Sequence, residues 1–245
     1  KREEARMETY AAMVDRLDQG VGRVLQALET AGVADNTVVM FLSDNGGCAT
    51  WPNGRPGQEE GFLKYNQNIP VGDGRGYEFV GKGWGWAQNA PFRQFKTWCH
   101  EGGIATPLIV RWPGHVKAGS ITHQVGHIID FMPTLLELAG SQYPKTYQQQ
   151  PLLPVEGKSL LPIFQGQQRK GHASLSWELL GNRAIRQGKW KLVWGASEKR
   201  WELFDMAADR SETRDLAATF PERVKAMAAD WHAWQERVEQ DRSSN

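Results

Sequence analysis

A carboxylate and a carboxamide stand directly after an apolar run, and their residue types suit metal binding. The run 37–42 is short, β-branched and apolar, which predicts a buried strand that ends at Ser43-Asp44-Asn45-Gly46-Gly47. Open α/β sheets carry their ligand sites at the carboxyl ends of strands. The oxygens of Asp44 and Asn45 suit a hard cation such as Ca²⁺. Asp-Asn-Gly-Gly is also a favourable turn sequence, so the pattern alone leaves both interpretations open.

A second block with reactive side chains follows over residues 89–114, with the sequence NAPFRQFKTWCHEGGIATPLIVRWPG. It resembles the motif of the sulfatases of the alkaline-phosphatase superfamily. That motif has Pro-x-Arg, a lysine three positions after the arginine, Glu-Gly-Gly, and a strand that ends in Trp-Pro-Gly. Pro91, Arg93 and Lys96 match its first part, and 101–103 and 112–114 match the rest. The Asp44 block resembles the same family's metal motif and precedes the lysine in the same order.

Further blocks extend the resemblance from about Tyr10 to Leu216. Residues 130–140 resemble the family's helix after that strand, and 157–162 and 182–193 resemble parts of its C-terminal region. Several ordered blocks are far more specific than one short motif. The chain is therefore identified as a member of the sulfatase (arylsulfatase-like) family, and it resembles the C-terminal half only.

The resemblance implies roles for three residues. Asp44 and Asn45 would bind the metal, Ca²⁺ in preference to Mg²⁺, and Lys96 would bind the sulfate and act as a catalytic group. An ammonium supplies a compact positive charge for sulfate oxygens and can stabilise the leaving oxygen. Arg93 matches the pattern but is expected to pair with a structural carboxylate such as Glu101.

The family's nucleophile is not found in this sequence. It is a Cys or Ser in a Cys/Ser-x-Pro/Ala-x-Arg signature, oxidised to formylglycine, in the N-terminal part of the enzyme. Neither Cys48 nor Cys99 stands in such a signature, and whether they are paired is left open. The fragment alone is therefore expected to be inactive.

The resemblance implies a sulfuric ester hydrolase whose substrate is a sulfated small molecule or a sulfated carbohydrate. A periplasmic or extracellular location is expected from the family. Two alternatives stay open: a phosphoester or phosphonate hydrolase of the same superfamily, and a non-catalytic sulfatase-like binding module. An unmodified Thr or Ser nucleophile would favour phosphate, and loss of calcium binding would favour the module.

Charge and hydropathy exclude some partners. The net charge is +1, which implies no electrostatic affinity for nucleic acid or for a membrane surface. No stretch approaches the roughly 20 apolar residues of a transmembrane helix, so no membrane span is expected.

Periodicity predicts the elements that must position these side chains. Apolar residues at helical spacing from Tyr10 to Leu28 predict a helix with one buried face, after a polar lead. Residues 46–88 show no sustained period, which fits a loop over the active-site mouth or a flexible insertion. The remaining expected elements are a strand over 104–112, a helix over 130–138, an antiparallel hairpin of 190–194 with 201–204, and a helix over 220–238.

Together these elements predict an α/β fold. A mixed, largely parallel sheet flanked by helices would occupy 1–150, as the C-terminal portion of the catalytic domain. A smaller α+β subdomain with a short antiparallel sheet and a closing helix would occupy 151–245. Sheet strands left without their neighbours would expose apolar edges, so the isolated chain is expected to self-associate.

Some aromatic and histidine residues carry two interpretations. Trp84 and Trp86, which glycines flank, could stack on a sugar or aryl face of the substrate, or could pin the loop to the body. His123 and His127 precede a helix and are expected to be packed or capping residues.

Overall fold

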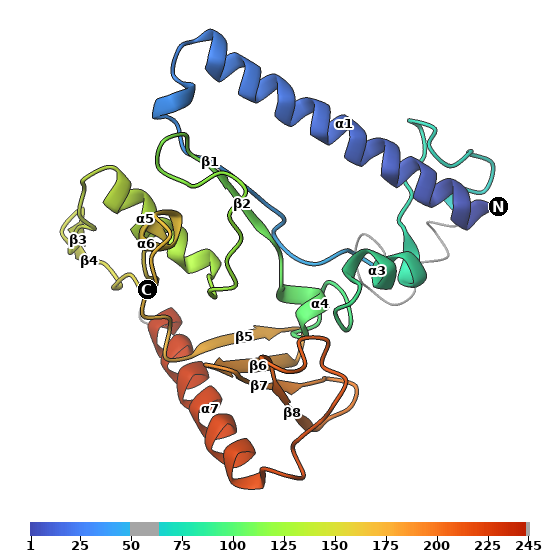
Figure 1. Cartoon of the computed structure of the whole chain (residues 1–245). Helices are drawn as coiled ribbons and strands as arrows, with labels where there is room; N and C mark the ends of the chain where they lie inside the picture. Colours follow the sequence, from blue (N-terminus) through green and yellow to red (C-terminus); the bar gives the residue numbers. More distant parts are fainter. Residues whose placement is uncertain (50–63, 244–245) are drawn as a thin grey trace. The chain divides into compact units, whose positions relative to one another are not determined.

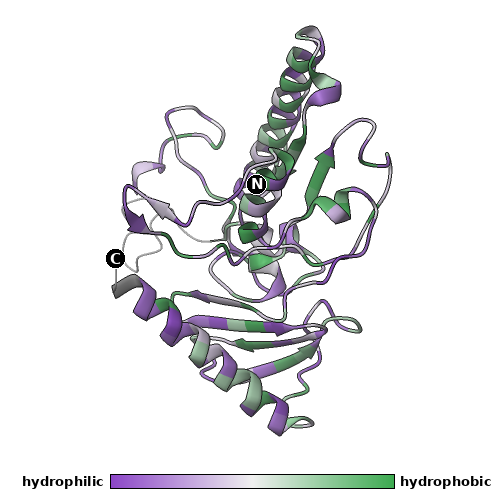
Figure 2. Cartoon of the chain, turned by 90° about the vertical axis from the view of Figure 1, so that its left-hand side faces the viewer, coloured by the Kyte–Doolittle hydropathy of each residue, from purple (hydrophilic) through white to green (hydrophobic). Residues whose placement is uncertain are grey.

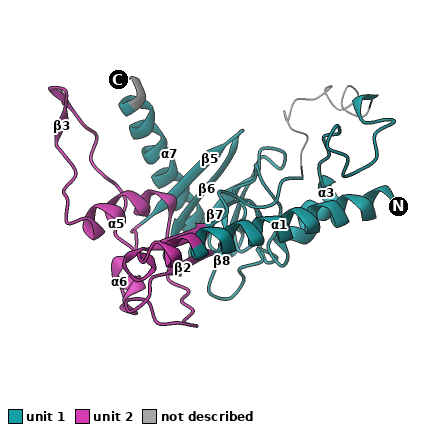
Figure 3. Ribbon diagram, turned by 90° about the horizontal axis from the view of Figure 1, so that it is seen from above, with its two compact units in different colours: residues 1–26, 42–107, 174–245 teal, residues 27–41, 108–173 magenta. Residues whose placement is uncertain are grey.

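The structure, a computed structural model, describes residues 1–49 and 64–243 (Figure 1). The chain forms two compact units, each built from segments that are far apart in the sequence (Figure 3). The first unit comprises 1–26, 42–107 and 174–245, and the second comprises 27–41 and 108–173. The expected domain boundary at residue 150 stays a prediction.

A four-stranded antiparallel sheet forms the centre of the first unit. Its strands follow one another in chain order, and two-residue connections join β5 to β6 and β6 to β7, whereas residues 195–200 join β7 to β8. The hairpin predicted from alternation is confirmed, with Trp190 opposite Asp205 and Trp194 opposite Trp201. The strands are β5 (Leu175–Leu179), β6 (Asn182–Gln187), β7 (Trp190–Trp194) and β8 (Trp201–Asp205).

The closing helix α7 (Pro221–Ser243) covers one face of this sheet, which confirms the expected C-terminal helix. Met227 and Trp231 of α7 are buried against Ile185, Leu192 and Leu203 of the three strands β6 to β8. Burying a side chain of this kind contributes about 1.5–3 kcal/mol. The opposite face buries a second cluster, which consists of Cys99, Ala184, Val193, Phe204 and Met206.

The first helix, α1 (Arg2–Thr30), begins earlier than expected, because the polar lead is itself helical. The prediction of a buried face is wrong, since no residue of α1 is buried. Met13, Leu17 and Val24 are 65%, 54% and 58% exposed. Figure 2 shows the apolar residues along this helix in green. The stripe has the right spacing for packing, but no segment within the described ranges covers it.

Two short strands, β1 (Val39–Leu42) and β2 (Leu108–Arg111), pair with each other. The strand expected over 104–112 is shorter than predicted, because Glu101–Ile104 forms the helical turn α4. The larger, mostly parallel sheet stays a prediction. The long stretch before α4 is also not featureless, since it contains the nine-residue helix α3 (Gly81–Asn89).

A buried carboxylate, that of Asp130, binds several groups of the second unit. Asp130 is the last residue of the 3₁₀ turn η2 (Ile128–Asp130) and directly precedes helix α5 (Phe131–Leu138). It is fully buried. Arg169 Nη2 donates to its Oδ2 at 2.8 Å, and His172 Nε2 lies 2.7 Å from its Oδ1. Burial alone would raise the pKa of Asp130, but the Lys158 backbone N–H and these side chains outweigh burial and lower it.

The remaining elements of the second unit are small. His127 accepts a hydrogen bond from the Ile129 N–H, which confirms its expected capping role. The segment after α5 forms the pair β3 (Thr146–Tyr147) and β4 (Gln150–Pro151) and the turn of helix α6 (Leu161–Phe164). Within the described ranges, no helix is long and apolar enough to cross a membrane.

Candidate functional site

The candidate metal residues lie in a tight turn immediately after β1. Ser43 Oγ donates to the Asn45 carbonyl at 2.8 Å, and Asn45 Nδ2 donates to Asp44 Oδ1 at 2.8 Å. The Asp44 side chain is exposed and that of Asn45 is half-buried. The turn therefore brings the Asp44 and Asn45 side chains into contact at the end of a strand. Their role in metal binding stays a prediction.

Main-chain hydrogen bonds join this turn to the segment that carries the candidate lysine. The Gly46 N–H donates to the Gly103 carbonyl at 3.0 Å, and the Lys96 N–H donates to the Gly47 carbonyl at 3.0 Å. Residues about fifty positions apart in the sequence therefore form one local structure. Asp44, Asn45 and Lys96 all belong to it.

Asn89 is a residue of this site that sequence reasoning missed. It is the last residue of α3, and its Oδ1 accepts from the Gly47 N–H at 2.8 Å, while its Nδ2 donates to the Gly85 carbonyl at 2.6 Å. The side chain therefore fixes the turn to the helix through both ends of its amide. Its position at the start of the block 89–114 was the available signal.

Glycines make the close approach possible. A Cβ atom on Gly46 would overlap the Gly102 carbonyl, and one on Gly102 would overlap the carbonyls of Gln94 and Arg93. A Cβ atom on Gly103 would overlap the Trp98 carbonyl. These neighbours are backbone atoms and cannot rotate away, so the paired glycines set backbone geometry, as expected.

Replacing Gly46 by alanine should therefore destabilise the fold by about 2 kcal/mol or more, because a methyl group is forced into backbone atoms. Gly22→Ala is the matched control, since a Cβ there meets nothing within 4 Å and the site is an exposed turn of α1. It should leave the stability unchanged or raise it by up to about 1 kcal/mol. Urea unfolding of both variants gives the comparison. Equal stability of the two variants would contradict the close approach.

Backbone strain surrounds the candidate lysine. Gln94 has φ +66° and Thr97 has φ +85°, and the latter is unusual for a β-branched residue. Each such conformation costs on the order of 1–3 kcal/mol and is kept only where the surroundings impose it. Asn182 Nδ2 of β6 donates to the Thr97 carbonyl at 3.0 Å and helps to hold it. Half-buried Lys96 lies between the two strained residues.

A buried ionic cluster contacts the Glu-Gly-Gly turn of residues 101–103. Lys191 Nζ of β7 lies 2.9 Å from Glu101 Oε1 and 2.9 Å from Glu212 Oε1, and all three side chains are buried. Glu212 Oε2 also accepts from the Glu101 N–H at 2.7 Å. Arg210 Nη2 lies 3.2 Å from Glu101 Oε2 at the edge of the cluster.

The prediction that Arg93 pairs with Glu101 is wrong. Arg93 Nη1 lies 3.3 Å from Glu202 Oε2 and donates to the Glu212 carbonyl at 3.4 Å, whereas Glu101 pairs with Lys191. The arginine is therefore structural, as expected, but with a carboxylate from β8. Sequence spacing could not show this because the partner is more than a hundred residues away.

Burial alone would raise the pKa of Glu101, but Lys191 and then Arg210 outweigh burial and lower the pKa from 4.5. A carboxylate with a lowered folded pKa contributes stability above its unfolded value, and this contribution is lost as the pH falls through the folded pKa. We therefore expect the free energy of unfolding to fall more steeply below about pH 5 in the wild type than in Glu101→Gln. Urea titrations across this pH range measure it. Parallel curves would contradict the assignment.

The donor set fits a hard cation in part. The exposed oxygens of Asp44 and Asn45 have the right chemistry, but Ca²⁺ takes 6–8 oxygens. Within the described ranges, no group of three or more His, Cys, Asp or Glu residues could hold a metal ion. These two residues therefore supply at most part of a metal site.

The two cysteines are in different environments. Cys48 is exposed and Cys99 is buried, and no disulfide joins them. Burial raises the pKa of the Cys99 thiol to about 11, so it stays protonated at neutral pH.

Comparisons with known proteins show the family of the chain. The sulfatase family model matches residues 1–141, more than half of the chain, and a model described as N-sulphoglucosamine sulphohydrolase, C-terminal, matches 92–233. An uncharacterized sulfatase of Schizosaccharomyces pombe is 35% identical over 234 residues, which are 92% of this chain and 42% of that protein. An arylsulfatase of Klebsiella aerogenes is 34% identical, over 69% of this chain and 37% of its own length.

Solved structures show the same fold. The crystal structure titled Ps i-CgsB in complex with k-i-k-neocarrahexaose has a TM-score of 0.68 and 26% identity, and the match covers 94% of this chain and 43% of that one. The chain thus spans less than half the length of the relatives named here. Both the sequence matches and the shared fold lead to one conclusion: this chain belongs to the sulfatase family.

Proposed function

We propose that the parent protein is a sulfuric ester hydrolase of the arylsulfatase type. The observation that carries the proposal is the main-chain junction between Gly47 and Lys96, because it gathers the turn of Asp44 and Asn45 and the lysine into one local structure. A decayed binding module would have no need to keep oxygen donors and a cation together. The family membership supports the same reaction class.

In this proposal Asp44 and Asn45 contribute oxygens to a Ca²⁺ site whose other ligands come from elsewhere in the parent. The cation would supply charge stabilisation at the sulfate oxygens. Asn45 Nδ2 donates to Asp44 Oδ1, and this hydrogen bond fixes the two side chains relative to each other.

Lys96 binds a sulfate oxygen and stabilises the leaving oxygen in this proposal. Hydrogen bonds from the Lys96 N–H to the Gly47 carbonyl and from Asn182 to the Thr97 carbonyl hold the main chain of this segment, so the position of the lysine backbone is fixed. A formylglycine nucleophile belongs to another part of the parent, and the chain alone is inactive. We further propose a periplasmic or extracellular location.

A sulfated carbohydrate is the proposed substrate, with an aryl sulfate as the alternative. Support comes from the carbohydrate complex of the solved relative at 26% identity, and the arylsulfatase relative supports the alternative. Rates of the parent on 4-nitrophenyl sulfate, on a sulfated oligosaccharide and on 4-nitrophenyl phosphate separate the classes. Preference for the phosphate ester would overturn the proposal. Recovery of activity when calcium is returned after chelation tests the cation.

We expect the isolated chain to self-associate, because the apolar stripe of α1 is exposed at Met13, Leu17 and Val24. Size-exclusion chromatography with light scattering should show species larger than the 27.6 kDa monomer. Replacing the three residues by glutamate should shift the chain toward the monomer. A clean monomer of the unaltered chain would contradict the expectation.

A further inference from the structure

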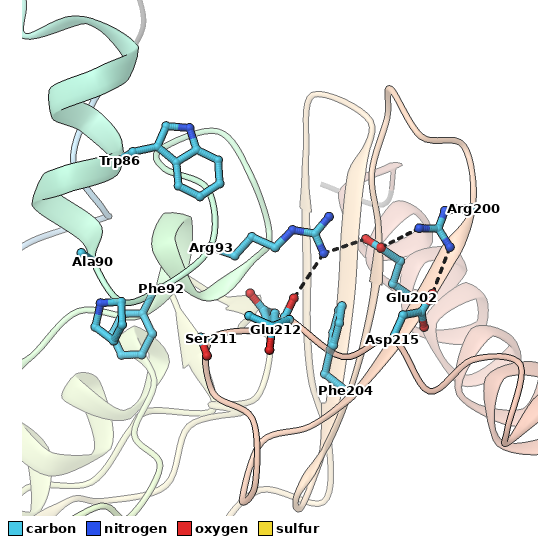
Figure 4. Close-up of a pocket in the computed structure, with 12 residues that line it drawn as sticks. Trp86, Ala90, Phe92, Arg93, Arg200, Glu202, Phe204, Ser211, Glu212 and Asp215 are labelled. Atoms are coloured by element: carbon cyan, nitrogen blue, oxygen red, sulfur yellow. Dashed lines mark hydrogen bonds and ion pairs between the residues drawn. The ribbon is translucent and has the colours of Figure 1, made fainter.

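The first unit contains a cavity that the proposed sulfate site does not use. Its volume is about 600 Å³, within the range of small-molecule sites. Residues from α3, from the segment after α3, from β8 and from the loop after β8 line it (Figure 4). Asp44, Asn45 and Lys96 are not among its lining residues.

One wall of the cavity is a chain of ion pairs with alternating sign. Arg93 Nη1 lies 3.3 Å from Glu202 Oε2, and Arg200 Nη2 lies 2.9 Å from Glu202 Oε1. Arg200 Nη1 then lies 2.9 Å from Asp215 Oδ2 (Figure 4). The two guanidinium groups and two carboxylates balance each other, so this wall carries no net charge. Its accessible side chains are Arg93, Arg200 and Asp215, which offer donors and an acceptor.

The carboxylate at the centre of this wall is fixed. Glu202 is 2% exposed, and besides the two arginines His100 Nε2 lies 3.5 Å from its Oε2. The hydrogen-bond contribution of His100, followed by the charge of Arg93, lowers the pKa of Glu202. The group therefore stays charged at neutral pH and holds the two guanidinium groups in place.

Aromatic side chains form the opposite wall. Trp86 is 43% exposed, and its ring meets Phe95 edge to face at 6.0 Å, which holds the indole while leaving a face accessible. Phe92 extends this apolar lining, whereas Phe204 is fully buried on β8, on the same side of the cavity as Glu202. Trp84 behaves differently, since its Nε1 donates to the Glu3 carbonyl at 2.9 Å and pins the loop. The two interpretations of the tryptophans thus divide between the two residues.

An apolar wall that faces a charge-balanced wall of paired donors and acceptors matches a neutral polyhydroxyl ring. Such a ring stacks its C–H face on an aromatic side chain, and its hydroxyl groups both donate and accept. A sulfate group would need unpaired positive charge, and both arginines here are already paired with carboxylates. We propose that this cavity binds an unsulfated, neutral sugar residue.

The inference goes beyond the proposed function and does not depend on hydrolysis. The two sites share elements, however, because α3 carries both Asn89 and Trp86, and the following segment carries both Lys96 and Arg93. An oligosaccharide with a sulfated and a neutral residue could therefore contact both sites. Specificity for the sugar chain would then come from the cavity, and recognition of the ester from the lysine.

Saturation-transfer NMR of the chain with neutral hexasaccharides of glucose and of galactose tests the proposal without turnover. We expect transfer to at least one of them, and about tenfold weaker binding for Trp86→Ala. Trp86→Phe should recover part of the affinity, because it keeps an aromatic face. Arg200→Met removes one of the two guanidinium groups of the charged wall, at a side chain that is 59% exposed, and it should weaken binding as well.

Two controls make the result decisive. Arg75→Met removes a similarly exposed ion pair, with Asp73, outside the cavity and should leave binding unchanged. Inorganic sulfate should not displace the neutral sugar. The proposal is overturned if neither neutral hexasaccharide binds, if Trp86→Ala binds as well as the wild type, or if only sulfated sugars bind. Failure of sulfate hydrolysis in the parent would leave this binding result intact.

Discussion

Replacing Lys96 by alanine in the parent enzyme should lower kcat/KM for a sulfate ester by about 10²–10³-fold, the usual cost of losing one preorganised electrostatic group. In this segment the Lys96 ammonium is available to bind the negatively charged sulfate, because Arg93 is already paired with Glu202. Because the proposed interaction strengthens as charge develops on the leaving oxygen, kcat should fall more than KM rises. Steady-state kinetics on the parent measures both.

Three comparisons make this result specific. Lys117→Ala removes an exposed lysine outside the site and should leave kcat/KM unchanged. Lys96→Arg keeps the charge but moves it on a longer, planar group, so it should recover only part of the loss. The urea midpoint of Lys96→Ala should match that of the wild type. Activity within a few-fold of the wild type would show that Lys96 does not act on sulfate.

The residues of the candidate site were chosen from the order of local patterns along the chain, and their roles stay predictions. An oxygen-bearing turn after an apolar run and a lysine three residues after an arginine are local patterns. Their meeting through Gly47 and Lys96 is not local, yet the paired glycines signalled that two backbones come close. The contribution of Asn89 was missed although it begins the block 89–114, because an amide at a helix end has many possible partners.

The failure for α1 has a physical explanation. The spacing of apolar residues from Tyr10 to Leu28 correctly predicts a helix, because periodicity reports the side-chain geometry of one element. It cannot report whether another segment covers the stripe. In the described ranges nothing does, so a correct secondary-structure prediction gave a wrong burial prediction.

The buried cluster was also beyond sequence reasoning. Lys191 stands between Trp190 and Leu192 in a strand where alternation assigns it to the solvent side. It is fully buried because the other face of β7 is covered too, by segments that bring two carboxylates to its ammonium. Burial alone would lower the pKa of Lys191, but Glu212 and then Glu101 outweigh burial and raise it. The Lys191 side chain therefore stays protonated inside the protein.

Replacing Lys191 by methionine should destabilise the chain by about 3–5 kcal/mol, the usual cost of removing one partner from a buried ionic group. Methionine keeps most of the side-chain volume, so the loss comes from the electrostatics and not from a cavity. Glu101 and Glu212 would face each other in the interior without a cation, and Glu101 would lose the partner that fixes the Glu-Gly-Gly turn. Urea unfolding with a constant m-value would measure the change.

Lys189→Met is the matched control, because this lysine lies two positions away and pairs with Asp205 at the surface, where its side chain is 55% exposed. Its effect on stability should be small. Adding Glu101→Gln and Glu212→Gln to Lys191→Met should recover part of the loss, since the uncompensated charges are then gone. If the Lys191→Met and Lys189→Met variants were equally stable, the buried cluster would not stabilise the Glu-Gly-Gly turn that follows Lys96.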